Sequence, residues 1–316
     1  MRLHLRSAFL SVLKVIGIYF FFCFNFFTVA VLFIYFASDM IGIHLVTKVP
    51  YNIKEPGYYR VVNNLSTQSE GINIFTDNVV LDLGGFKLDG ETENVASSYD
   101  GVFANHRRNI TVRNGTITGF KNGINIYDED IDNLSDVEKL TSSGHLIENI
   151  RAVRNQRVGI MIVARSSSVR DNLVSGVLGN VSAQDLLYSY GISAQGPGLI
   201  IENNQVVNIV PPKNGEGVGI TIGRAGTGCI VKNNLVTNTS ERKAGKSYGI
   251  WIGGEKTQAY LDSNTVVNQT IGVAFSSTSR GTFNNNVVMQ SDQSYLLSND
   301  EVKSGGNNLG GNAEKE

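Results

Sequence analysis

Cysteine is nearly absent from this chain, which holds two in 316 residues. Cys23 lies in a long apolar run and Cys229 in the body of the sequence, which predicts a fold without a disulfide framework. An excess of either charge is lacking too, because 27 basic and 28 acidic residues leave a net charge of −1. Without a basic field, nucleic acid is not an expected partner.

The long uncharged stretch near the N-terminus predicts a membrane anchor. Residues 1–14 carry Arg2, Arg6 and Lys14, whereas residues 15–37 hold no charge. As a helix with a rise of 1.5 Å per residue, the stretch would be roughly 35 Å long, enough to cross a bilayer core of about 30 Å. The alternative is a cleaved signal peptide, whose apolar region is shorter, about 7–15 residues. Because the positive charges come first, we expect a single-pass protein with a cytoplasmic N-terminus and a periplasmic or extracellular body.

A short repeat runs from residue 71 almost to the C-terminus. Each copy opens with glycine, an apolar residue, a variable residue and a second apolar residue, and a second apolar pair follows around a turn residue. The four apolar columns begin at Ile72, Ile74, Leu83 and Leu88, and all 32 of their positions are apolar. The copies recur every 22 to 36 residues and open at Gly71, Gly101, Gly123, Gly159, Gly191, Gly219, Gly249 and Gly272.

The period within each copy predicts strands, because a spacing of two turns alternate side chains to the same side. Such short strands bury a core only when copies stack on one another. A leucine-rich horseshoe would need a helix in each repeat, and a propeller would need blades of about 40 residues. The repeat therefore favours an all-β fold, a parallel β-helix with three strands in each turn and eight to nine turns.

The segments 78–90 (NVVLDLGGFKLDG) and 109–120 (NITVRNGTITGF) resemble the first turns of bacterial proteins in the pectin-lyase-like, right-handed β-helix superfamily. The resemblance covers roughly residues 50–305 and implies a right-handed helix. It also implies a function within a wide range, since that superfamily holds polysaccharide lyases, hydrolases, epimerases and adhesins. We expect a linker and cap at 38–70, the β-helix at 71–305 and a flexible tail at 306–316.

Two further columns are expected to hold the turns in register. Asparagine follows the turn residue on successive copies, where its amide can bond to the copies above and below. Charges of alternating sign lie on the outside just before this point, where opposite charges in neighbouring strands attract. The asparagines are Asn172, Asn204, Asn234, Asn264 and Asn286, and the charges are Asp82, Arg113, Glu148, Arg170, Glu202, Lys232 and Asp262.

The outer face of the first strand of each copy is the candidate binding surface. Its columns hold amides, hydroxyls and aromatic rings without a charge, a mixture that suits the flat faces and hydroxyls of sugars. Longer connections at about 175–190, 207–218 and 237–248 are expected to stack into a wall beside it. The candidate polysaccharide-binding residues are Trp251, Tyr248, Tyr190, Tyr127, Phe103 and Asn125.

Candidates for chemistry come from the turns. Glycoside hydrolysis needs paired carboxylates, and proton abstraction from a uronate needs a base beside a cation, but the first-strand face offers neither. The candidates lie on neighbouring copies of the repeat and are Glu216, Arg224 and Lys246. Together they could bind an acidic sugar and move a proton. The acidic segment 127–144, with Asp128, Asp130 and Asp132, is either a solvated loop or a Ca²⁺ site, since Ca²⁺ takes six to eight oxygen ligands.

These patterns predict a membrane-anchored, extracytoplasmic β-helix that binds a polysaccharide and, if it is an enzyme, acts as a lyase or a uronate epimerase. The alternative is a non-catalytic, adhesin-like scaffold that binds a protein partner in the cell envelope. No cofactor is required for either reading, apart from the candidate Ca²⁺.

Overall fold

The structure is a computed structural model that describes residues 42–90, 97–129, 139–179, 188–212, 215–239, 245–310 and 313–315. The chain divides into two compact units, residues 1–45 and 46–316. The described part of the first unit is the start of strand β1 (Ile43–Val46). The expected membrane span at 15–37 and the basic segment before it lie outside the described residues. Within the described ranges, no helix has the length and apolar character that crossing a membrane requires.

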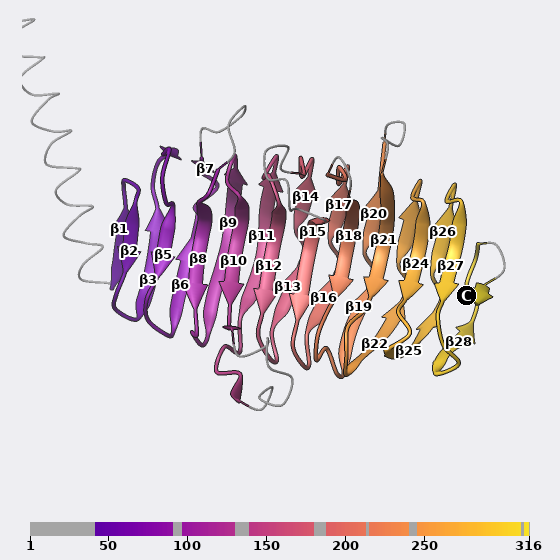
Figure 1. Cartoon of the computed structure of the whole chain (residues 1–316). Helices are drawn as coiled ribbons and strands as arrows, with labels where there is room; N and C mark the ends of the chain where they lie inside the picture. Colours follow the sequence, from indigo (N-terminus) through magenta and orange to yellow (C-terminus); the bar gives the residue numbers. More distant parts are fainter. Residues whose placement is uncertain are drawn as a thin grey trace, which may run out of the picture. The chain divides into compact units, whose positions relative to one another are not determined.

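The second unit is a stack of turns, which we call rungs, and Figure 1 shows them following one another in chain order. The first strand of each rung belongs to one sheet, which we call the first sheet, and the neighbouring strands in it run parallel. Its strands are β2 (Tyr51–Ile53), β5 (Ile72–Ile74), β8 (Asp100–Asn105), β10 (Asn122–Tyr127), β12 (Val158–Val163), β15 (Tyr188–Gln195), β18 (Glu216–Ile222), β21 (Lys246–Ile252), β24 (Ile271–Phe275), β27 (Gln293–Leu297) and β29 (Ala313–Lys315).

The second and third strands of each rung form another parallel sheet that bends around the core. The second strands are β3 (Gly57–Val61), β6 (Val79–Asp82), β13 (Ser168–Arg170), β16 (Ile200–Glu202), β19 (Cys229–Lys232), β22 (Thr257–Asp262), β25 (Ser279–Asn284) and β28 (Val302–Gly306). The third strands are β4 (Leu65–Ser66), β7 (Lys87–Asp89), β14 (Leu173–Ser175), β17 (Gln205–Val207), β20 (Leu235–Thr237), β23 (Thr265–Val267) and β26 (Val287–Met289). In two rungs a single strand, β9 (Ile110–Thr118) or β11 (Leu146–Val153), supplies both.

The expected apolar columns form the core, with one correction. The first column is fully buried along its whole length, for example at Ile72, Ile124 and Val273. The third column begins at Leu81, not at Leu83, because β6 pairs Leu81 with Val112. Leu83 is buried in a turn of four residues (83–86) where β9 has only two (114–115), and this longer turn displaced the sequence alignment.

The stack of rungs begins before Gly71 and continues beyond the eighth copy of the repeat. Strands β2, β3 and β4 pair with β5, β6 and β7, so residues of the expected cap build a complete rung of their own. At the other end, β27 and β28 continue the two sheets, and Leu296, Leu297 and Val302 are buried there. The solenoid therefore starts before the segment in which its glycine signature begins.

The glycine that opens each copy is required by the closeness of the rungs. A Cβ at Gly159 would lie 2.8 Å from the Gly191 carbonyl oxygen, and closer still to Val174 of the third strand. At Gly219 the same atom would lie 2.6 Å from the Gly249 carbonyl oxygen. Real Cβ atoms do not tolerate such contacts, so any other residue here would force neighbouring rungs apart.

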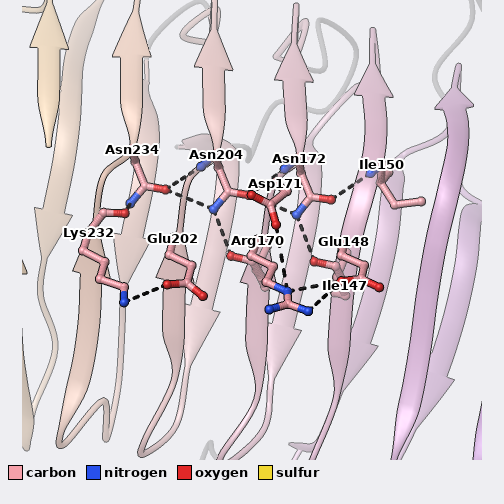
Figure 2. A network of polar contacts seen from close by, with 11 residues as sticks. Ile147, Glu148, Ile150, Arg170, Asp171, Asn172, Glu202, Asn204, Lys232 and Asn234 are labelled. Atoms are coloured by element: carbon pink, nitrogen blue, oxygen red, sulfur yellow. Dashed lines mark hydrogen bonds and ion pairs between the residues drawn. The ribbon is translucent and has the colours of Figure 1, made fainter.

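The asparagine column is a buried ladder that extends to Asn308, as Figure 2 shows for three of its members. Asn204 Nδ2 donates to the Val169 carbonyl of the preceding rung at 2.9 Å and to Asn234 Oδ1 of the next rung at 3.0 Å. Asn204 Oδ1 accepts from the Asn172 backbone N–H at 3.1 Å and from Asn172 Nδ2 at 3.0 Å. The predicted structural role is confirmed, since the polar atoms of this buried amide are all satisfied.

The alternating charges lie side by side in register, as predicted. Each register pair along the column joins opposite signs, from Asp82 beside Arg113 to Lys232 beside Asp262. Arg170 Nη2 lies 2.9 Å from Glu148 Oε2, and Lys232 Nζ lies 2.9 Å from Glu202 Oε2 (Figure 2). The column thus holds the register of the second strands from outside, opposite the buried amides.

Candidate functional site

The outer face of the first sheet carries the columns that the sequence predicted. One column places Met161, Ser193, Thr221 and Trp251 side by side on β12, β15, β18 and β21. A second column, three residues earlier along each strand, runs through Val158, Tyr190, Val218 and Tyr248. Within these four strands the two columns are uncharged, so this face presents rings, hydroxyls and thioether rather than ionised groups.

Four aromatic side chains stack on this face into a ridge, which we define as Tyr188, Tyr190, Tyr248 and Trp251. Tyr188 stacks on Tyr190 and on Trp251, with ring centroids 5.7 Å apart in both pairs. Trp251 also stacks on Tyr248 at 5.7 Å. The ridge packs on Val218 of the intervening strand, and only Tyr248 of its members is fully buried. The rings therefore support one another, and Trp251 is held in place rather than free to rotate.

Burial in the ridge changes the acidity of its phenols. Desolvation raises the pKa of Tyr190 far above its usual value, an effect that the nearby Arg157 charge partly offsets. Desolvation also raises the pKa of Tyr188, and the neighbouring Glu216 carboxylate adds to the rise. Both phenols stay protonated at neutral pH, so they can donate hydrogen bonds but do not serve as ready bases.

Beside the ridge lies a groove of about 450 Å³ that crosses β12, β15, β18 and β21. Its hollow exists because Gly223 and Gly253 occupy successive positions where β15 has Gln195. A Cβ on Gly253 would lie 2.9 Å from the indole nitrogen of Trp251, and one on Gly223 would lie 2.9 Å from Cγ of Gln195. Neighbouring side chains thus extend over the backbone of the two glycines and form the sides of the groove.

The polar groups of the groove come from three strands and two turns. Ser193, Gln195 and Thr221 supply hydroxyls and an amide, and Arg157 and Arg224 add a guanidinium from either end of the strands. Trp251 is half-buried, and its indole N–H makes no hydrogen bond within the described part of the chain. The groove therefore offers an aromatic wall together with several hydrogen-bond donors.

The structure divides the predicted binding residues into three groups. Trp251 and Tyr190 line the groove, whereas Tyr248 lies beneath Trp251 as part of the ridge. Phe103 and Tyr127 lie on β8 and β10, outside the groove lining. Asn125 is largely buried.

Asn125 belongs to a separate polar cluster on β8 and β10. Its Nδ2 donates to Asp100 at 2.7 Å, and Asn122 Nδ2 donates to the other oxygen of the same carboxylate at 2.7 Å. Burial nevertheless raises the pKa of Asp100, because the loss of water outweighs the two amide contacts. The amide of Asn125 is thus engaged by a carboxylate of its own face.

Sequence reasoning missed Tyr188, which connects the two halves of the ridge. It had been assigned to a connection expected in the wall, but it begins β15 in register with Glu216. The alternation of Tyr188 and Tyr190 at a spacing of two was the available signal, since it places both rings on one side of a strand. The wall itself is only partly described, because residues 180–187, 213–214 and 240–244 lie outside the described ranges.

The candidate catalytic set does not converge. Glu216 and Lys246 are register partners at the start of β18 and β21, and the Lys246 ammonium lies 5.3 Å from the centre of the Tyr248 ring. Arg224 follows the other end of β18, eight residues beyond Glu216, which is roughly 26 Å of extended strand. Of the three, only Arg224 lines the groove.

Asp128 serves as an anchor for the connection that follows β10. Its side chain is fully buried, and its Oδ2 accepts the backbone N–H groups of Thr141 and Ser142, both at 2.9 Å. His106 Nδ1 lies 3.1 Å from its Oδ1, so both oxygens already have protein partners. Asp130 and Asp132 lie outside the described residues, and the described ones contain no group of three metal-binding side chains. Calcium binding by this loop stays a prediction.

Comparison with known proteins identifies the repeat. The family model described as "Right handed beta helix region" matches residues 62–266. Among curated proteins, the sequence finds no match.

Several solved structures align with this chain at low sequence identity. The Dettilon tailspike protein aligns with a TM-score of 0.55 and 15% identity over 83% of this chain and 52% of its own, so this chain spans about half of the tailspike. PfbA, a surface adhesin of Streptococcus pneumoniae, aligns with a TM-score of 0.49 and 12% identity over 81% of this chain and 64% of its own. Pectate lyase Pel9A aligns with a TM-score of 0.46 and 13% identity over 82% of this chain and 69% of its own.

Proposed function

Since this chain belongs to the family of the right-handed β-helix region, we propose that its β-helix binds a polysaccharide in the groove beside the aromatic ridge. The observation that carries the proposal is the position of Trp251. Its ring is fixed by stacking on two tyrosines, while its indole edge lines the hollow above Gly253. A rigid aromatic wall loses little entropy when a sugar ring packs against it.

The polar lining fits the rest of a sugar. Hydroxyls and an amide at strand spacing can exchange hydrogen bonds with the hydroxyls that surround each ring. The groove crosses four neighbouring strands about 4.8 Å apart, so an extended chain could lie along the helix axis and contact each strand in turn.

The proposal is binding without turnover. The described residues that line the groove include no Asp or Glu, whereas glycoside hydrolysis uses a pair of carboxylates. Lyase or epimerase chemistry by Glu216, Arg224 and Lys246 is not proposed either, because Glu216 and Lys246 lie at the far end of the strands from Arg224.

We also propose, from the sequence, that residues 15–37 anchor the protein in a membrane. The support is the uncharged run preceded by Arg2, Arg6 and Lys14. The β-helix would then be displayed outside the cytoplasm, where polysaccharides of the cell surface are accessible.

The test is binding of the full-length protein, in detergent where needed, to a panel of neutral and acidic polysaccharides. We expect Trp251→Ala to weaken the binding seen for the unaltered protein about tenfold, since one aromatic contact contributes roughly 0.5–1.5 kcal/mol beyond its buried area. Gly223→Leu should weaken binding as well, because its side chain would occupy the floor of the groove. Tyr260→Ala is the matched control, as Tyr260 is an exposed aromatic residue on the other sheet.

Two results would end the proposal. One is that no polysaccharide of the panel binds, which would favour a protein partner. The other is that binding survives unchanged in both groove variants while circular dichroism shows them folded.

A further inference from the structure

The groove contains a guanidinium group whose buried N–H is unsatisfied. Nε of Arg157 is shielded from solvent and has no hydrogen-bond partner. The backbone of Arg157 is held on both sides, since its N–H donates to the Lys121 carbonyl and its carbonyl accepts the Tyr190 N–H. A buried donor without an acceptor costs free energy, so a ligand that supplies an acceptor at this position would gain affinity.

The charge around this donor is one-sided. Arg157 and Arg224 both line the groove, and the lining residues that the structure describes include no acidic side chain. The Glu216 carboxylate begins β18 in register with Tyr188 and lies outside the lining. Two guanidinium groups and no carboxylate in the described lining favour a negatively charged ligand.

We propose that the groove selects a saccharide unit that bears a carboxylate, and that Arg157 is the residue that recognises it. This inference rests on the proposed function, because it names the substrate class of the same groove. A planar carboxylate matches the guanidinium fork with two parallel hydrogen bonds, and one of its oxygens would satisfy the buried Nε–H of Arg157. Arg224 adds a second positive charge at the opposite end of the strands, which favours a chain with several acidic units.

The experiment compares probes that differ in charge and little else. Full-length protein is titrated with polygalacturonate, with its methyl-esterified form, with a neutral glucan and with dextran sulfate, at two salt concentrations. We expect polygalacturonate to bind at least about tenfold more tightly than the esterified form, because a hydrogen bond to a charged group is worth roughly 10- to 100-fold in affinity. Dextran sulfate separates a requirement for a carboxylate from a requirement for any anion.

Arg157→Gln should remove this preference, and Arg157→Lys should restore little of it, since an ammonium lacks the planar fork. The matched control is Arg151→Gln, which removes one guanidinium from β11, where both register neighbours, Thr116 and Leu173, are uncharged. A preference that survives in the Arg157→Gln variant would overturn the inference.

The outcomes also separate this inference from the proposed function. Equal binding of the acidic and esterified chains, lost in Trp251→Ala, would keep polysaccharide binding and reject carboxylate selection. Tighter binding of dextran sulfate than of polygalacturonate would replace the carboxylate by a general anion. No binding of any probe would reject both.

Discussion

At the scale of single residues, the ladder of asparagines shows how polar side chains are accommodated inside this protein. Asn204, Asn234 and Asn264 are almost completely buried, a position that would cost free energy for an amide without partners. Each of them donates through Nδ2 to a carbonyl of the preceding rung and to the side-chain oxygen of the next asparagine. Because every amide has the same neighbours, each rung is joined to the next in only one register.

His145 is a buried titratable group on which stability should depend. It is 2% exposed, its Nδ1 accepts the Ile110 N–H at 3.2 Å, and burial lowers its pKa from 6.5 to about 4. The neutral form therefore stabilises the fold fully above about pH 6.5, where the unfolded chain is neutral too. As pH falls towards 4, the His145 imidazole is protonated in the unfolded chain but stays largely neutral in the folded protein. About 3 kcal/mol of the free energy of unfolding should therefore be lost.

The measurement is the free energy of unfolding of the unaltered protein and of His145→Asn between pH 7 and pH 4. Asn keeps an acceptor near the position of Nδ1 but does not titrate in this range. We expect the unaltered protein to be the more stable at pH 7 and the gap to close as pH falls. Parallel curves would show that His145 does not titrate with the lowered pKa.

At the scale of elements, the second strands are connected by charges as well as by backbone hydrogen bonds. Arg170 on β13 lies between Glu148 on β11 and Glu202 on β16, and its guanidinium bonds to Glu148 (Figure 2). These side chains are partly exposed, so each pair contributes modestly and the effect depends on salt.

We expect Arg170→Glu to lower the melting temperature. The substitution places three carboxylates on adjacent strands, replacing two attractive neighbours by two repulsive ones, and should cost roughly 1–2 kcal/mol. The control Arg151→Glu makes the same change on β11 beside uncharged Thr116 and Leu173. Equal melting temperatures for both variants, or a loss that high salt does not reduce, would contradict the ladder.

At the scale of the whole molecule, the two units of the chain raise separate questions. Each rung of the second unit contacts mainly its neighbours in the stack, as expected of a solenoid. The first unit contains residues 15–37, for which we propose a membrane span.

The orientation of the chain is tested by protease protection in intact cells. If residues 15–37 span the membrane with the N-terminus inside, added protease should digest the β-helix or its loops without cell lysis, after the outer envelope has been made permeable. An epitope placed before Arg2 should stay protected. Digestion of the β-helix only after lysis would reject the orientation.

Much of the fold could be predicted because the same pattern of apolar residues and glycines recurs in each copy of the repeat. The alternation of apolar residues along each strand, as at Ile124 and Ile126, specifies strands and their buried side, and the spacing of glycines specifies the rungs. The error at Leu83 arose where one turn is longer than the others, since sequence spacing alone does not show which residues pair. The rung formed by β2, β3 and β4 was missed because it lacks the glycine that marks the later copies.

The length of the repeat, the buried and exposed faces of its strands, and the asparagine and charge ladders can all be derived from the sequence, because they follow from the types of residue at fixed spacings. The site depends instead on contacts between strands. Tyr188 and Trp251 meet across an intervening strand, and the groove exists because two glycines leave space beside larger side chains. Glu216 and Arg224 are only eight residues apart in the sequence, yet the extended strand β18 keeps them at its opposite ends. Ring stacking, the hollow of the groove and separation along a strand depend on the three-dimensional positions of side chains. A pattern of residue types in the sequence does not predict them.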